Sequence, residues 1–201
     1  IFMCKTFIFI TKPKWFFFAS TSHVYNSQNN KKISENSILR PATKYGFTKI
    51  KAEKYIEKNL TIPHAIGRIF SYTHYNQSTS FLIPSLVNRI KIKKKLFENL
   101  NHYRDFVHID DIASAINLMW KIRAKGVFNI GSGKKITVKG LILKIVKKIN
   151  AGKPIFGILG MRSDEPKNSY PNIMKAKKYL SWIPKVTLEK GLSKTINFYK
   201  K

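Results

Sequence analysis

The chain has 201 residues and a mass of 23.3 kDa. Hydrophobic residues make up 43% of it and charged residues 24%, a globular composition that excludes a disordered protein. The single cysteine, Cys4, excludes an internal disulfide framework and a cysteine-rich zinc site, and it favours a reduced, cytoplasmic protein.

The formal net charge is +28, from 38 Lys and Arg against 10 Asp and Glu. Such an excess is typical of proteins that bind nucleic acid. Here it is mostly lysine spread along the whole chain, whereas contacts to bases and phosphates favour arginine. We therefore interpret the lysines as surface residues and expect no nucleic-acid partner. A basic nucleic-acid-binding module remains an alternative hypothesis.

The N-terminal stretch 1–18 is apolar and superficially resembles a signal peptide. Lys5, Lys12 and Lys14 interrupt it, and the chain contains no uninterrupted apolar run long enough for a membrane span. We therefore expect no membrane partner. Because the sequence begins without methionine, in what we interpret as a helix leading into the first strand, we expect a chain that is truncated at its N-terminus.

Apolar runs and helical periodicities alternate along the chain. The run Trp15–Ala19 is continuously apolar, as in a parallel strand covered on both faces. In chain order we expect a strand at 15–20, a polar loop at 26–37, a helix at 43–59, a strand at 65–70, a helix at 81–94, a helix opened by Asp110 and Asp111, a strand at 127–130 and a helix at 138–149. This alternation predicts an α/β fold with a parallel sheet.

Gly131 and Gly133 follow the strand at 127–130. Ile136 stands where a dinucleotide-binding G-x-G-x-x-G motif needs its third glycine. We interpret the two glycines as a turn that ends the strand, and we find no Gly-rich loop for phosphates in this chain.

Tyr45 and Lys49 stand four residues apart on a predicted helix, so their side chains share one face. An ammonium group near a phenol favours the ionised phenol, which makes a tyrosine usable as an acid and base near neutral pH. The pair alone is weak, because a chain with many lysines and tyrosines contains such spacings by chance. Its support is Ser20-Thr21-Ser22, hydroxyls that we expect at the carboxyl end of a parallel strand, where open α/β sheets bind ligands.

A metal site is the competing interpretation for a second polar cluster, formed by His102, His108, Asp110 and Asp111. The two carboxylates suit the positive start of the following helix better than a metal. We therefore expect no metal.

Four segments, in order and at matching spacing, resemble the extended short-chain dehydrogenase/reductases, specifically the NAD-dependent nucleotide-sugar epimerases and dehydratases. They are 18–25 with the catalytic Ser/Thr, 45–49 with Tyr-x-x-x-Lys, 104–111 with Arg-Asp-Phe-x-His-x-Asp-Asp, and 127–133 with a late strand and turn. Residues 176–192 resemble the family's terminal helix-turn-helix.

The resemblance implies a role for each matching residue. Tyr45 would be the general acid and base, Lys49 would hold the nicotinamide ribose, and Thr21 would hydrogen-bond the reacting oxygen. The implied NAD contacts are Tyr45, Lys49 and Phe70, and the implied contacts to a nucleotide-diphosphate sugar are Thr21, Ser22, Ser71, Arg104 and Arg162.

The resemblance also implies an organisation: a partial Rossmann-like parallel sheet with helices, plus a smaller, interleaved C-terminal substrate-binding domain. We expect residues 1–72 to be the remnant of the NAD-binding domain with the catalytic residues. Residues 73–104 would be a substrate-domain segment, 105–131 a helix and strand returning to the sheet, and 132–201 the C-terminal substrate-binding segment. The family often forms homodimers, so a homodimer is expected.

Three departures from the family pattern narrow the expected function. The Gly-rich NAD-binding loop is missing, Ser71 stands where an Asn commonly contacts substrate, and Ser22-His23 occupies the place of an Asp-Glu pair of the 4,6-dehydratases. We therefore expect an NAD-dependent nucleotide-sugar epimerase or 4-ketoreductase of carbohydrate biosynthesis, incomplete as given. An inactive fragment of this fold is the alternative from the same family.

Overall fold

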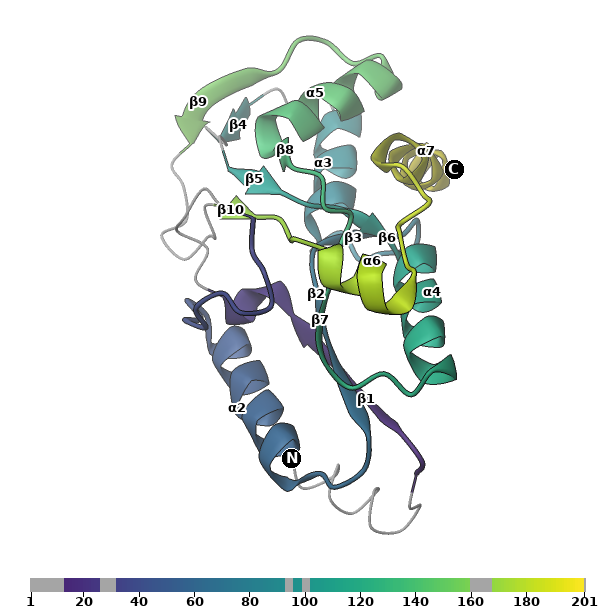
Figure 1. Cartoon of the computed structure of the whole chain (residues 1–201). Coiled ribbons are helices and arrows are strands. Elements are labelled where there is room, and N and C mark those ends of the chain that lie inside the picture. The colour runs from purple at the N-terminus through teal and green to yellow at the C-terminus, as the bar shows by residue number, and fades with distance from the viewer. Residues whose placement is uncertain (1–12, 26–31, 93–95, 99–101, 160–167, 201) are drawn as a thin grey trace.

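A three-stranded parallel sheet in the order β1-β2-β7 forms the centre of the fold (Figure 1). The structure is a computed structural model and describes residues 13–25, 32–92, 96–98, 102–159 and 168–200. The strands are β1 (Phe16–Thr21), β2 (His64–Ile69) and β7 (Gly126–Ile130). Their carboxyl ends are in register, because Thr21 pairs with Ile69 and Ile69 pairs with Ile130.

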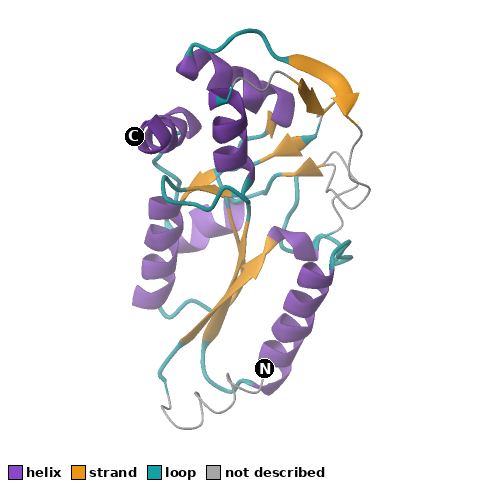
Figure 2. Cartoon of the chain, turned by 180° about the vertical axis from the view of Figure 1, so that it is seen from behind, coloured by secondary structure: helices purple, strands orange, loops and turns teal. Residues whose placement is uncertain are grey.

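Helices cover the two sides of this sheet. Helix α2 (Lys44–Asn59) lies on one side, and α4 (Ile109–Lys121) and α6 (Met174–Leu180) lie on the other (Figures 1 and 2). The Trp182 side chain is buried with this group and donates from Nε1 to the Asp111 carbonyl at 3.1 Å. The parallel sheet and the helices confirm the α/β prediction.

Strand β1 is less buried than its apolar sequence predicted. Phe16, Phe17 and Phe18 are only partly buried, and Ala19 is exposed. Among the described residues β1 lies at the edge of the sheet, paired with β2 alone. The expectation of a strand covered on both faces is therefore wrong for the part of the chain that the structure describes.

A second group of helices packs at the other end of the molecule (Figure 2). These are α3 (Leu82–Lys91), α5 (Val138–Ile149) and α7 (Leu188–Lys200), which share a core that includes Leu86, Leu141 and Leu192. Helix α3 ends at Lys91, earlier than expected, and residues 93–95 lie outside the described part. Beside these helices are the short strands β4 (Leu96–Glu98), β5 (Tyr103–Arg104), β8 (Ile136–Thr137), β9 (Ile155–Leu159) and β10 (Asn168–Ser169).

Two short strands lie where the expected domain segments meet. Strand β3 (Tyr72–Thr73) pairs in parallel with β6 (Val107–His108). The C-terminal segment 132–201 divides between the two helix groups, since α6 packs with the sheet while α5 and α7 pack with α3.

In the described ranges, no helix combines the length and apolarity needed to cross a membrane.

Candidate active site

A cavity of about 550 Å³ opens at the carboxyl ends of β1 and β2, beside the start of α2. It brings together six of the eight residues that the sequence assigned to a site: Thr21, Ser22, Tyr45, Lys49, Phe70 and Ser71. Arg104 does not line it, and Arg162 lies outside the described residues. Other side chains in its wall include Ser20, His23, Gln77 and Phe81.

Lys49 spans the gap between α2 and β1. Its Nζ donates to the Ala19 carbonyl at 2.8 Å and lies 5.7 Å from the centroid of the Tyr45 ring. Tyr45 is 53% exposed. The helix therefore presents a phenol to the cavity with a positive charge beside it, as the four-residue spacing predicted.

Thr21 is buried at the end of β1 and caps the short 3-10 helix η1 (Ser22–Val24). Its Oγ1 accepts from the His23 amide at 3.3 Å. The His23 ring in turn stands edge-on to the Tyr45 ring, with centroids 6.0 Å apart. The hydroxyl and the phenol are thus walls of the same cavity, supplied by two elements that are adjacent in space.

His23 sits at the rim of this cavity, exposed on one side and surrounded by protein on the other. Partial desolvation, followed by the positive charge of Arg104, lowers the pKa of His23. Arg104 itself is buried in β5 and donates from Nη1 to the Tyr103 carbonyl at 3.1 Å. Its charge therefore reaches the cavity even though its side chain is not part of the wall.

Ser22 and Phe70 are both buried where they line the cavity. Ser22 Oγ accepts from Ser169 Oγ at 3.5 Å. The Phe70 amide donates to the Ile130 carbonyl at 2.9 Å, which fixes the backbone just after β2. Ser71 follows directly and shares the cavity wall.

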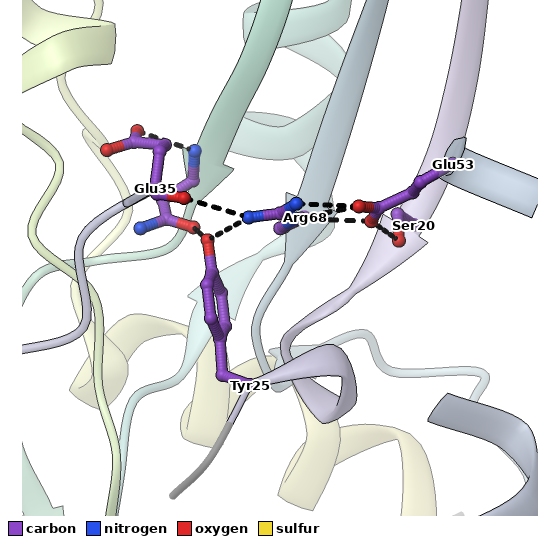
Figure 3. Close-up of polar contacts among 6 residues, drawn as sticks. Ser20, Tyr25, Glu35, Glu53 and Arg68 are labelled. Atoms are coloured by element: carbon purple, nitrogen blue, oxygen red, sulfur yellow. Dashed lines mark hydrogen bonds and ion pairs between the residues drawn. The ribbon is translucent and has the colours of Figure 1, made fainter. Parts of the chain in front are cut away.

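A buried polar network behind the cavity was not foreseen from the sequence. Arg68 of β2 pairs with Glu53 of α2 and with the Tyr25 hydroxyl (Figure 3). Burial raises the pKa of Tyr25 to about 12, so this phenol stays protonated. The sequence offered two signals, Arg68 inside an apolar strand and Glu53 one helical turn after Lys49. Neither signal predicts that these two side chains form an ion pair.

Three of the four residues considered as metal ligands, His108, Asp110 and Asp111, lie at the start of α4. His108 caps the helix by accepting from the Asp110 amide at 3.2 Å. Asp111 accepts from the Lys185 and Val186 amides, each at 2.9 Å. Within the described part of the chain, no three His, Cys, Asp or Glu side chains gather as a metal would require.

The turn at Gly131–Gly133 ends β7, which confirms its interpretation. Gly133 has a φ of +72°, a backbone conformation that favours glycine. The Asp105 carboxylate accepts from the Ser132 amide at 2.7 Å, from the Ser132 hydroxyl at 2.8 Å and from the Lys134 amide at 3.0 Å. Burial outweighs these bonds and raises the pKa of Asp105 to about 6.

The sequence profile of the GDP-mannose 4,6-dehydratase family matches residues 4–195. The chain belongs to this family of NAD-dependent nucleotide-sugar epimerases and dehydratases. The resemblance predicted from four short segments is therefore confirmed over almost the whole chain.

Members of this family with similar sequences include epimerases from two bacteria. The chain is 30% identical over 190 residues to an uncharacterised UDP-glucose epimerase of Bacillus subtilis, covering 91% of this chain and 60% of that protein. It is 28% identical over 192 residues to a UDP-glucuronate 4-epimerase of Thermodesulfobacterium geofontis, covering 90% and 58%. The chain thus spans about 60% of the length of these relatives.

Solved structures of epimerases share the fold. The UDP-glucose 4-epimerase of Thermotoga maritima with UDP-glucose matches with a TM-score of 0.86 at 25% identity, covering 98% of this chain and 66% of that one. The UDP-glucuronic acid 4-epimerase of Bacillus cereus with UDP-glucuronic acid and NAD matches with a TM-score of 0.84 at 27% identity, covering 92% and 61%.

The cavity wall of this epimerase/dehydratase-family chain offers groups that suit part of NAD, the cofactor that the resemblance implies. An ammonium group carries three hydrogen-bond donors. The ammonium group of Lys49 lies on the cavity wall beside Tyr45 and uses one of its donors on the Ala19 carbonyl. Such donors suit the hydroxyls of a ribose, and Phe70 adds an apolar wall.

Proposed function

We propose that this chain supplies the catalytic residues of an NAD-dependent nucleotide-sugar 4-epimerase or 4-ketoreductase. The observation that carries the proposal is that Thr21, Tyr45 and Lys49 line the same cavity. Family membership supports a nucleotide sugar as the substrate.

Each of the three side chains has a distinct task in the proposed reaction. As a phenolate, Tyr45 takes the proton from a sugar hydroxyl during oxidation, and as a phenol it returns that proton during reduction. The Thr21 hydroxyl hydrogen-bonds the same oxygen, and the positive charge of Lys49 stabilises negative charge on the phenol oxygen. NAD, when bound, supplies the acceptor and donor of hydride.

Dehydration of the sugar is the less favoured reaction. Removing water from a sugar needs a proton donor and acceptor besides the tyrosine. The described cavity wall contains no Asp or Glu. Ser22 and His23 occupy the two positions at which the resemblance places the Asp-Glu pair of the 4,6-dehydratases. Inversion of one sugar carbon, or reduction of a 4-keto sugar, needs no acid or base besides the tyrosine once NAD supplies the hydride transfer.

Sequencing the coding DNA upstream of Ile1 is the first test. We expect an in-frame strand, a G-x-x-G-x-x-G loop and a helix, which would supply the pyrophosphate site at a helix N-terminus. An upstream sequence of another kind would contradict NAD-dependent catalysis by this gene product.

The second test replaces the proposed acid and base. In the complete reading frame, Tyr45→Phe should lower kcat for epimerisation of UDP-glucose or UDP-glucuronate, or for reduction of a 4-keto sugar, by roughly 100-fold or more, because general acid–base catalysis contributes that much. Tyr179→Phe is the matched control, since Tyr179 is an exposed tyrosine on α6 outside the cavity wall. Turnover retained in Tyr45→Phe would exclude the proposed role.

A further inference from the structure

A buried ion pair lies behind the cavity and joins the helix that carries Tyr45 and Lys49 to the sheet. Arg68 donates from Nε to the two carboxylate oxygens of Glu53 at 3.2 and 3.1 Å, and from Nη2 to Oε2 at 2.6 Å. Glu53 is 2% exposed and Arg68 is 3% exposed. Figure 3 shows the guanidinium facing the carboxylate between β2 and α2.

On the carboxylate side, the pair connects to the strand end that carries Thr21. Ser20, its neighbour in β1, donates its hydroxyl to Glu53. Glu53 lies one helical turn after Lys49, which lies one turn after Tyr45. The Ser20–Glu53 bond therefore ties β1 to α2 close to the residues that both elements present to the cavity.

On the guanidinium side, the pair connects to the turn that carries His23. Arg68 Nη1 donates to the Tyr25 hydroxyl and to the Glu35 carbonyl, each at 3.0 Å. Tyr25 closes η1 and donates to Asn129 Oδ1 of β7 at 2.7 Å. One guanidinium thus links α2, β2, η1 and, through Tyr25, β7.

We propose that the Glu53–Arg68 pair, together with the Tyr25 hydroxyl that Arg68 binds, positions Tyr45 relative to Thr21 for the reaction, an inference that rests on the proposed function. Stability alone does not account for the pair. Burying two charges costs desolvation, and apolar residues of similar volume often replace a buried pair without loss of stability. Catalysis does account for it, because a displacement of about 1 Å between reacting groups lowers rates by roughly 100-fold.

The test removes both charges together, so that neither is left buried alone. In the complete reading frame, the double variant Glu53→Leu/Arg68→Met should fold but lose roughly 10- to 100-fold in kcat, with KM for the nucleotide sugar within about threefold of wild type. A folded double variant with kcat within twofold of wild type, or with only a raised KM, would overturn the proposal.

Asp111→Asn is the control for a general loss of stability. Asp111 is equally buried and accepts two backbone bonds, but it lies outside the cavity wall. We expect this variant to be destabilised with kcat unchanged. A matching fall of kcat in Asp111→Asn would show that stability, and not position, controls turnover, and would overturn the inference.

Tyr25→Phe decides the matter if the double variant does not fold. It removes one hydroxyl from the network, leaves the ion pair intact and keeps the aromatic contact with Phe70, whose ring centroid is 6.3 Å away. We expect a fall in kcat of roughly threefold or more at constant KM. An unchanged kcat in Tyr25→Phe would overturn the proposal.

Wild-type activity separates the two levels of inference. If the complete wild-type protein turns over no nucleotide sugar with NAD, the proposed function fails. If the wild type is active and the folded variants keep its kcat, only the positioning role fails.

Discussion

Asp105 shows how much a single buried carboxylate contributes to the shape of this molecule. It is fully buried and accepts three hydrogen bonds from the turn after β7. Its neighbour Phe106 lines the cavity. The protonation state of one residue is therefore coupled to the backbone just beyond the sheet.

Burial favours the protonated form of Asp105 in the folded state, since its pKa rises to about 6 from 3.8. The folded pKa is the higher one, so the stabilisation is complete below about pH 4 and is lost as the pH rises through about 6. The unfolding free energy of the wild type should therefore fall relative to that of Asp105→Asn by roughly 2–3 kcal/mol between pH 4 and pH 7. Urea unfolding across this range measures it, and a difference that does not vary with pH would contradict the argument.

At the scale of elements, the close approach of α2 to η1 determines where Tyr45 stands. Thr43 caps α2 by accepting from the Gly46 amide at 3.1 Å. A Cβ on Gly46 would lie 2.3 Å from the His23 carbonyl oxygen and 2.9 Å from Pro41 Cβ. Only glycine lets the first turn of the helix rest against the backbone of the turn that follows Thr21.

Gly46→Ala should therefore destabilise the protein by roughly 1–3 kcal/mol, because an added methyl in a packed interface forces the backbone apart. Gly140→Ala is a closely matched control. Gly140 holds the same position in α5, with its amide donating to Thr137 Oγ1 at 2.9 Å, but its Cβ would meet only side-chain atoms, the nearest at 3.0 Å. We expect this control to stay within about 1 kcal/mol of wild type in urea unfolding; equal losses in both variants would refute the close-approach argument.

The molecule as a whole carries a net charge of +28, and this charge affects the stability of the folded state. Exposed ion pairs are few among the described residues, and one of them, Lys144 with Glu189 at 2.6 Å, joins α5 to α7. Mutual repulsion of the remaining lysines opposes compaction.

Salt should therefore stabilise the fold. Raising NaCl from about 0.01 M to about 0.1 M shortens the Debye length from about 30 Å to about 10 Å. We expect the urea midpoint of unfolding to rise over this range, with a neutral sugar at equal osmolality as the control. A midpoint that stays constant or falls with salt would show that charge repulsion does not limit stability.

Local sequence predicted the elements and motifs well. The pattern of less polar residues and the four-residue spacing of Tyr45 and Lys49 located α2 to within one residue, because helical periodicity is a property of neighbouring residues. The apolar run of β1, followed by hydroxyls, located the cavity edge for the same reason. The family resemblance then predicted six of the residues that line the cavity.

The contacts between distant segments were decided only by the tertiary structure. Glu53, Arg68 and Tyr25 meet behind the cavity, and Asp105 accepts bonds from a turn 27 residues away. No periodicity announces such pairs, because which buried polar group finds which partner depends on how the strands and helices stack. Local patterns thus determined what this chain can form, and packing determined which of its charges are buried together and what they hold in place.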